Sequence, residues 1–489
     1  MTETPLRKSL ALRGLFGLLL QLILRLRGLL IIPVLTRALP PSELGVISLG
    51  NALVAGLAPL LVLGMHSGLS LRVVRLEGEE IRPAILTVLS FSAVFSVAVT
   101  VLLLSIVSTG LFGGALKPLL PVLLPVGLFA IGISLREIST VLPQVRQELR
   151  FIAGINIFMD FGGAIAALLF VFAGWGAYGV LLGVGSLSLV GVVVAAIYSL
   201  KSAPGVWAWD SAFLKAALRT ALPAVPLSVG HSTLQFSDYF LVSYYRSVSD
   251  LATYGLAYNL ASPTLMAIAA INLTYLPTCV EILQKGQDAF ARFVDKSMIL
   301  FAVGGIAAIS FATSAGPALA AWFGGAIYTE SGRLLPIVVA GYVFFSLSQL
   351  QQFVPGAMIQ DMQASARAYL VAAVVNVATN FLLIPRFGMW GAAWSTLGSY
   401  ALAFVLLSRS VRALLPELRW MSRISHLVAL TALSVGFALP MQSRATGPIS
   451  ALLFGGGAAL VTVGLAFALR LLDRSDVERL RAFRPFAAS

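Results

Sequence analysis

The stretch PSELGVISL at residues 41–49 returns as VSDLATYGL at residues 248–256, at an offset of 207 residues. Three further matches keep the same order along the chain: Ser134–Pro143 with Ser346–Pro355 at an offset of 212, INIFMDF (155–161) with VNVATNF (375–381) at 220, and Trp-Gly-Ala (175–177 with 390–392) at 215. Internally duplicated hydrophobic chains are typical of secondary transporters, which bind their substrate between the repeats. The repeat therefore favours transport as the function.

Composition defines the class of protein. The 489 residues are 58% hydrophobic and only 11% charged, with a mean hydropathy of +0.93. Soluble globular domains are far less apolar, so the chain is a multi-pass membrane protein. The apolar stretch after MTETPLRKSLALR has no cleavage signature and is expected to stay as a first membrane helix. The single cysteine, Cys279, excludes an internal disulfide and a cysteine-rich metal site.

Apolar runs of about 20 residues predict fourteen membrane-spanning helices. They lie near 14–35, 43–65, 83–106, 117–135, 151–173, 176–199, 216–244, 249–277, 297–318, 333–357, 367–385, 387–408, 424–441 and 447–469. When the loops are assigned alternately to the two sides, 25 of the 33 basic residues fall on the side of both termini. Cytoplasmic loops collect Lys and Arg, so both termini are predicted to be cytoplasmic. The net charge of +13 is then mostly a consequence of topology, with some attraction to anionic headgroups.

The repeat pairs helix 2 with 8, helix 4 with 10, and helices 5 and 6 with 11 and 12. Because six helices return the chain to the same side, the two halves are expected to have the same orientation about an axis along the membrane normal. The predicted domains are an N-terminal six-helix bundle (1–205), a C-terminal six-helix bundle (206–415), helices 13 and 14 outside the duplication (416–470), and a basic cytoplasmic tail (471–489).

Two stretches carry a family resemblance. Residues 30–65 contain a helix that ends in Thr-Arg, a turn, and then Ser-Glu-hydrophobic-Gly; residues 218–277 contain Leu-Pro, a late Asp in helix 7, and Ser-Asp-x-x-x-Tyr at the start of helix 8. The first 410 or so residues thereby resemble the oligosaccharide flippases of the multidrug/oligosaccharidyl-lipid/polysaccharide (MOP) exporter superfamily. The resemblance implies a two-bundle fold with a central cavity that moves undecaprenyl-diphosphate-linked oligosaccharides to the outer leaflet.

Helix 1 carries two arginines within its apolar run. A charged side chain at the centre of a membrane helix costs about 2.5 to 3.5 kcal/mol on insertion scales, so it usually faces a cavity or a partner. Arg25 shares a helical face with Gln21, whereas Arg27 points about 160° away. We therefore expect Arg25 to bind the diphosphate through its planar guanidinium. In the alternative interpretation, one or both arginines pair with an acidic residue such as Asp160 or Asp238.

Helix 7 carries a polar stripe at three- and four-residue steps: Ser228, His231, Ser232, Gln235, Asp238 and Tyr239. Such a face is expected to line the water-filled interior and contact the glycan, together with Asn259 of helix 8. His231 and Asp238 are also the candidates for a titrating pair if protons or sodium ions drive transport. Alternatively, His231 only donates a hydrogen bond between helices.

Helices 5 and 11 repeat a pair of polar residues one turn apart, Asn156 with Asp160 and Asn376 with Asn380. Their equivalence suggests facing positions near the pseudo-twofold axis. Alternatively, the asparagines link neighbouring helices, at about 0.6 to 2 kcal/mol each. Asp160 differs in charge and is a secondary candidate for ion coupling or for the cavity.

These patterns predict an all-α flippase, not an enzyme, that works by alternating access in the bacterial cytoplasmic membrane. No catalytic site, metal site or cofactor is predicted: the three histidines are scattered, and no nucleotide-binding loop or HExxH is present. Whether a proton or sodium gradient drives transport is left open by the sequence. The expected partners are a polyprenyl-diphosphate-linked glycan, membrane lipids and polysaccharide polymerase or assembly proteins, without nucleic acid. One alternative is an ion-coupled exporter of organic cations, which the arginine in helix 1 disfavours. Another is a membrane-embedded polymerase or ligase, which the short outer loops disfavour.

Overall fold

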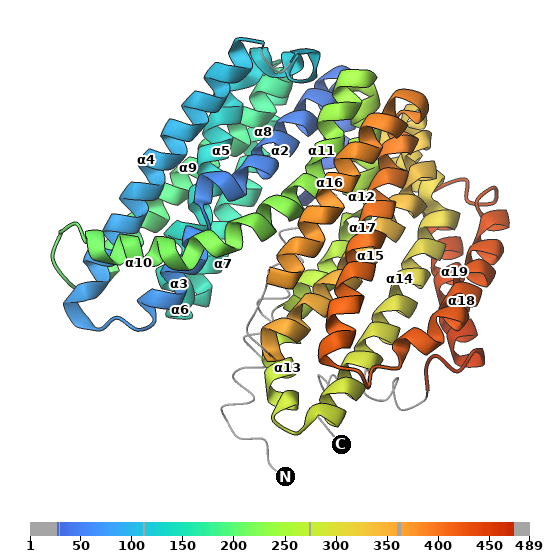
Figure 1. Cartoon of the computed structure of the whole chain (residues 1–489). Helices are drawn as coiled ribbons and strands as arrows, with labels where there is room; N and C mark the ends of the chain where they lie inside the picture. The colour runs from blue at the N-terminus through green and yellow to red at the C-terminus, as the bar shows by residue number, and fades with distance from the viewer. Residues whose placement is uncertain (1–26, 29, 111–112, 273–274, 359–362, 474–489) are drawn as a thin grey trace. The chain divides into compact units, whose positions relative to one another are not determined.

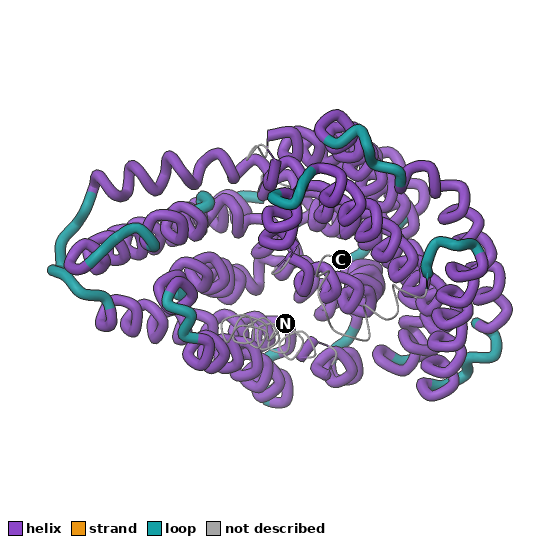
Figure 2. The backbone as a smooth tube through the Cα atoms, turned by 90° about the horizontal axis from the view of Figure 1, so that it is seen from below, coloured by secondary structure: helices purple, strands orange, loops and turns teal. Residues whose placement is uncertain are grey.

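The computed structural model describes residues 27–28, 30–110, 113–272, 275–358 and 363–473, and every regular element in them is a helix (Figures 1 and 2). Twelve helical segments in this part are long and apolar enough to cross a membrane. The predicted all-α, multi-pass architecture is confirmed. The count of fourteen stays a prediction, because helix 1 lies largely outside the described residues and α12 (Val248–Asn272), although helical, is not among the twelve.

The chain divides into two compact units, and the first of them is Met1–Ala252. Its long helices are α2 (Pro41–Val62), α4 (Ile81–Ser108), α5 (Leu123–Ser139), α9 (Gly176–Ser202) and α11 (Val225–Tyr245). A further long segment consists of α7 (Leu149–Ile157) and α8 (Gly163–Phe172), joined by a π turn, η4 (Phe158–Gly162). Three shorter helices are α3 (Met65–Val73), α6 (Val141–Val145) and α10 (Ser211–Ala221). In this unit α9 packs against α5 and α8, and α11 packs against α2.

Glycines allow the close packing of α9. A Cβ at Gly183 would lie 2.5 Å from the backbone nitrogen of Ala167 in α8, and one at Gly185 would lie 2.9 Å from that of Phe129 in α5. Small residues let membrane helices approach closely enough to gain dispersion contacts where no hydrophobic effect drives association. Two faces of α9 are therefore fixed by its sequence.

The second unit is Thr253–Ser489. It holds most of α12, followed by α13 (Tyr275–Leu283), α14 (Gln287–Gly324), α15 (Thr329–Met358), α16 (Gln363–Phe387), α17 (Met389–Leu414), α18 (Ile424–Ala438) and α19 (Pro448–Ala468). Helix α14 packs against α15 and α19, and α17 packs against α15 and α16. The hydroxyl of Thr462 in α19 donates to that of Ser310 in α14 at 3.1 Å, which joins the last predicted span to this unit.

The compact units and the sequence repeat have different limits. Helix α11, predicted as the first helix of the C-terminal bundle, packs with the first unit, which ends at Ala252. A helix at the start of one repeat thus completes the packing of the other. The domain limits predicted from the repeat remain predictions of sequence organisation.

Two of the recurring motifs meet at the start of α9. The carboxylate of Glu43, in Ser-Glu-hydrophobic-Gly, accepts a hydrogen bond from the backbone N–H of Ala177, in Trp-Gly-Ala, at 2.7 Å. An acidic group at a helix N-terminus satisfies an otherwise unpaired donor and complements the helix dipole. Gly176 has a φ of +54°, and a Cβ there would collide with the Glu43 carboxylate. This pair of motifs therefore has a structural role.

Candidate functional site

A group of polar side chains lies among the membrane-spanning helices of the first unit. We call Arg27, Arg136, Asn156 and Asp160 the charged cluster. Asn156 lies on α7 and Asp160 one turn later on the π turn η4, while Arg136 lies in the last turn of α5. Because α7 and η4 run on continuously, the four-residue spacing places both acceptors on one face.

Arg136 binds both of these acceptors. Its Nη1 and Nη2 donate to the two carboxylate oxygens of Asp160 at 3.1 and 2.6 Å. Its Nε and Nη2 also donate to Oδ1 of Asn156 at 3.0 and 2.6 Å. Paired charge-assisted hydrogen bonds of this kind fix geometry as well as adding energy. The guanidinium of Arg136 is therefore held rigidly against η4.

Arg27 adds a second cation to the same carboxylate. Its Nη1 donates to Oδ1 of Asp160 at 3.0 Å and to the backbone carbonyl of Asp160 at 3.2 Å. The exposed fractions of the three charged side chains are 30% for Arg27, 21% for Arg136 and 16% for Asp160. The cluster is therefore accessible, and the contact agrees with the alternative in which an arginine of helix 1 pairs with Asp160.

The charges of the cluster do not cancel. Two guanidinium groups face one carboxylate, which leaves one excess positive charge. Asp160 and Arg136 lie within candidate membrane spans, where a charge without compensation is costly. Such a charge is expected next to water or to an anionic ligand. The π turn that carries Asp160 is itself a rare element that occurs frequently at functional sites.

The polar pair in the second unit is neutral. Asn376 and Asn380 on α16 are fully buried, and the side-chain amide of Asn380 donates to Oδ1 of Asn376 at 3.0 Å. The amide of Asn376 reaches the hydroxyls of Ser395 and Thr396 on α17, each at 3.4 Å. This arrangement matches the interpretation in which asparagines link neighbouring helices.

The stripe on α11 does not share a single environment. Asp238 and Tyr239 are buried, and Oδ1 of Asp238 accepts from the backbone N–H of Tyr239 at 2.9 Å. His231 and Gln235 are partly buried, whereas Ser232 lines a cavity. The predicted contact of this stripe with a glycan stays a prediction.

The remaining predicted site residues belong to the second unit or lie outside the described part. Asn259 is exposed on α12, and its amide donates to the carbonyl of Gly255 in the same helix at 2.9 Å. Gln21 and Arg25 lie outside the described residues.

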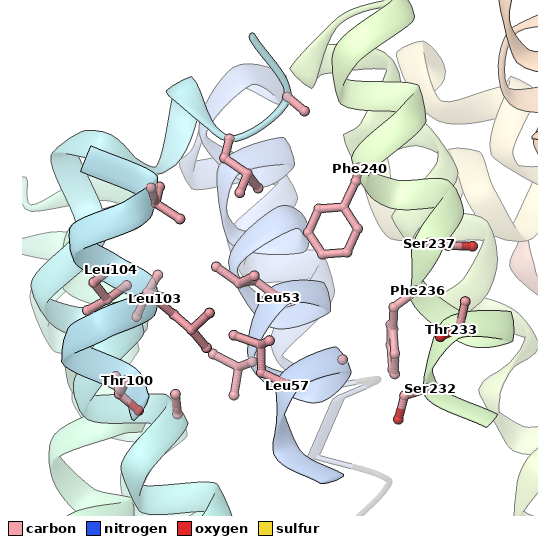
Figure 3. A pocket seen from close by; sticks show the side chains of 17 residues that line it. Leu53, Leu57, Thr100, Leu103, Leu104, Ser232, Thr233, Phe236, Ser237 and Phe240 are labelled. Carbon is pink, nitrogen blue, oxygen red and sulfur yellow. The ribbon is translucent and has the colours of Figure 1, made fainter. Parts of the chain in front are cut away.

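An apolar cavity of about 360 Å³ lies in the first unit, between α2, α4, α5 and α11 (Figure 3). Leu53 and Leu57 of α2 and Leu103 of α4 face Phe236 and Phe240 of α11 across it (Figure 3). None of its lining residues belongs to the charged cluster. The described part of this unit thus offers a polar and an apolar environment at separate places.

The sequence alone does not assign Arg136 to a site. It falls one residue past the predicted end of helix 4 and so counts among the cytoplasmic basic residues. The structure extends α5 to Ser139, which keeps Arg136 on the helix and opposite Asp160. The available signal was the combination of an Asn/Asp pair one turn apart and an arginine at the neighbouring helix end.

The fold is shared with solved membrane transporters. It is similar to the lipid II flippase MurJ in an inward closed conformation, with a TM-score of 0.72, 14% sequence identity and coverage of 93% of this chain and 99% of that one. It is also similar to an inward-facing multidrug resistance MATE family transporter of the MOP superfamily, with a TM-score of 0.68, 14% identity and coverage of 84% and 99%. The chain therefore has the same fold as these two membrane transporters.

A match to a family's sequence profile is more specific than the shared fold. The chain belongs to the polysaccharide biosynthesis protein family, whose sequence profile matches residues 34–324. No protein with a curated description matches the chain.

Proposed function

We propose that this protein is a flippase that moves undecaprenyl-diphosphate-linked oligosaccharides across the bacterial cytoplasmic membrane by alternating access, for export of cell-surface polysaccharide. The observation that carries the proposal is the excess positive charge of the charged cluster, within a fold of membrane transporters. Membership of the polysaccharide biosynthesis family supports a glycan substrate. Both termini are cytoplasmic in this proposal, as the distribution of basic residues indicates.

Different residues are assigned to the chemically different parts of the substrate. Guanidinium groups suit a diphosphate because they stay ionised and offer paired donors, and Arg25 is the residue that the sequence assigns to this role. The polar residues of α11, with Asn259 of α12, contact sugar hydroxyls. The polyprenyl chain stays in or beside the bilayer. Polysaccharide polymerase or assembly proteins receive the product on the outer side.

Ion coupling is the second part of the proposal. Asp160, Asp238 and His231 are the candidates for binding a proton or a sodium ion. In Asp160 both carboxylate oxygens already accept from arginines. Because the two guanidinium groups repel a further cation at this carboxylate, ion binding at Asp160 requires that at least one of them move away, which would link ion binding to a change at the charged cluster.

The second candidate function is ion-coupled export of organic cations, which the similarity to a MATE family transporter favours. A cation exporter needs a cavity with negative charge in excess of positive. The charged cluster has the opposite sign, so the flippase is the better supported function.

The deciding experiment reconstitutes the full chain in liposomes with a polyprenyl-diphosphate-linked oligosaccharide that a lectin detects on the outer surface. A flippase exposes the glycan to the lectin with time, and the Arg25→Ala protein, reconstituted at the same level, does so much more slowly. Uptake of ethidium by the same liposomes reports the alternative activity. Cation transport without glycan exposure would overturn the proposal.

A further inference from the structure

A second cavity lies in the second unit, between α12, α14, α15 and α19, with a volume of about 640 Å³. Like the first cavity, it is lined only by uncharged residues, most of them aliphatic or aromatic. We call the two spaces the unit 1 cavity and the unit 2 cavity. All the lining residues of each cavity belong to one unit.

The two cavities are built from equivalent positions of the sequence repeat. In the unit 1 cavity, Leu53, Gly56 and Leu57 of α2 line one wall; at an offset of 207 they correspond to Leu260, Pro263 and Thr264 of α12, which line the unit 2 cavity. The next wall comes from the next long helix of each unit: Thr100, Leu103 and Leu104 of α4 in the first, and Ala308, Phe311 and Ala312 of α14 in the second. The fold therefore forms this space twice.

The closing wall differs between the cavities. Phe236 and Phe240 of α11 close the unit 1 cavity, whereas Ala459 of α19 contributes to the unit 2 cavity. Neither of these helices is the partner of the other in the repeat. Two unrelated helices thus cover the same kind of space, and the side chains of the described residues leave it unfilled.

The chemistry of the lining selects an apolar occupant. An ion or a sugar would lose its hydration there without gaining enough polar partners. Both volumes lie within the range of about 300 to 1,000 Å³ that is usual for ligand pockets. Thr100 adds a hydroxyl that is 4% exposed and has no hydrogen-bond partner in the described part of the chain, so an oxygen of the occupant could accept from it.

The duplication indicates which apolar molecule fits. The proposed substrate has a single polyprenyl chain, which cannot fill two equivalent cavities in two units at once. Phospholipids surround every membrane span and carry ester oxygens beside their acyl chains. We propose that each cavity binds an acyl chain of a bilayer phospholipid, one in each unit.

Two glycines give a direct test. A Cβ at Gly56 would have its nearest neighbour at 3.9 Å, the Cβ of Phe236, and a Cβ at Gly304 would meet nothing within 4 Å. Gly56 lines the unit 1 cavity and Gly304 the unit 2 cavity. Leucine at either position should enter the cavity and exclude the lipid. Gly154→Leu on α7 is the matched control, because its Cβ also meets nothing within 4 Å and it lines neither cavity.

Native mass spectrometry of the purified full chain counts the phospholipids that remain bound. Gly56→Leu and Gly304→Leu should each retain one phospholipid fewer than the original protein, the double variant two fewer, and Gly154→Leu the same number. An unchanged number in a folded double variant would overturn the proposal. Loss of a bound polyprenyl lipid in place of phospholipid would overturn the choice of occupant.

A second measurement needs no variant. The original protein is placed in nanodiscs made with a phospholipid whose acyl chain carries a diazirine, and the sites of photolabelling are mapped. Label is expected on Leu57 and Leu103 in the first unit and on Leu260 and Phe311 in the second. Label confined to residues outside both cavities would overturn the proposal, whatever the outcome for flippase activity.

Discussion

Asp160 and Asn380 hold the same place in the repeat, yet their surroundings differ in charge and in helix geometry. Asp160 lies on a π turn and binds two arginines, whereas Asn380 lies within the uninterrupted helix α16 and binds a neighbouring asparagine. The equivalent of Arg136 in the second half is Ser348, whose hydroxyl donates to a carbonyl of its own helix. The duplication thus supplies a common scaffold, and only the first copy carries charge at this position.

This asymmetry is consistent with the chemistry of the proposed substrate. A lipid-linked oligosaccharide has one diphosphate, so one anion-binding position is sufficient. A neutral pair can link helices in either copy, at a modest gain per hydrogen bond. A charged cluster inside the membrane is costly, and that cost needs a functional reason in the copy that keeps it.

The largest expected effect is the loss of stability on removing the carboxylate at the centre of the charged cluster. Asp160→Asn leaves two guanidinium groups without a carboxylate, and breaking a buried ion pair in this way costs about 3 to 5 kcal/mol. Because the three charged side chains are 16 to 30% exposed, we expect a loss near the lower end of this range. Thermal unfolding of the purified protein in detergent measures it.

The matched change in the second unit is Asn380→Leu. It removes a hydrogen bond between neutral amides and is expected to cost about 1 kcal/mol. If the two variants lost the same stability, the charge on Asp160 would contribute no more to stability than a neutral amide does, and the comparison between the units would fail.

A smaller effect, on function, is expected for Arg27→Gln. This change leaves the Arg136–Asp160 pair intact and makes the cluster neutral, as in the second unit. Translocation of the lipid-linked glycan in liposomes should fall about tenfold, which corresponds to about 1.4 kcal/mol. The exposed Arg37→Gln near the end of the same predicted helix is the control and should leave the rate unchanged. An unaltered rate for Arg27→Gln would show that the excess charge does not serve transport.

The recurring motifs allow a third comparison. Glu43→Ala removes the acceptor at the start of α9 and should cost about 1 kcal/mol, as for the loss of a helix cap. Glu43→Gln keeps a side-chain oxygen and should cost less. Hydrogen exchange at the Ala177 amide measures the local effect. Asp250 is the equivalent of Glu43, but in the described part of the chain its carboxylate accepts no helix-capping hydrogen bond. Asp250→Ala should therefore change the hydrogen exchange of backbone amides little. Equal effects at both positions would contradict the structural role of the first motif.

How well each feature of the fold and of the site can be predicted from sequence depends on the interaction that produces it. Hydropathy and the repeat predict the helices, because membrane spans need long apolar runs and internally satisfied backbones. Asp160 stands out as the one charged member of a repeated polar pair. The role of Arg136 was missed because it depends on where α5 ends: a helix that ends at residue 135 leaves the arginine in a loop, whereas α5 extends to Ser139 and keeps it on the helix. The unit 1 cavity could not be predicted from the sequence either, because α11, which completes it, lies beyond the predicted limit of the first repeat.

The smallest effect is expected where an ion pair is exposed. Arg333 lies 3.2 Å from Glu330 on α15, three residues apart, and the two side chains are 62% and 34% exposed. Solvent screens such a pair, so Arg333→Gln should cost only about 0.3 kcal/mol. The same arginine-to-glutamine change at Arg27 removes a pair of similar length at about half that exposure. Thermal unfolding of the two variants side by side therefore separates the effect of burial from that of pairing. A loss at Arg333 as large as the loss at Arg27 would mean that the membrane environment adds nothing to the charged cluster.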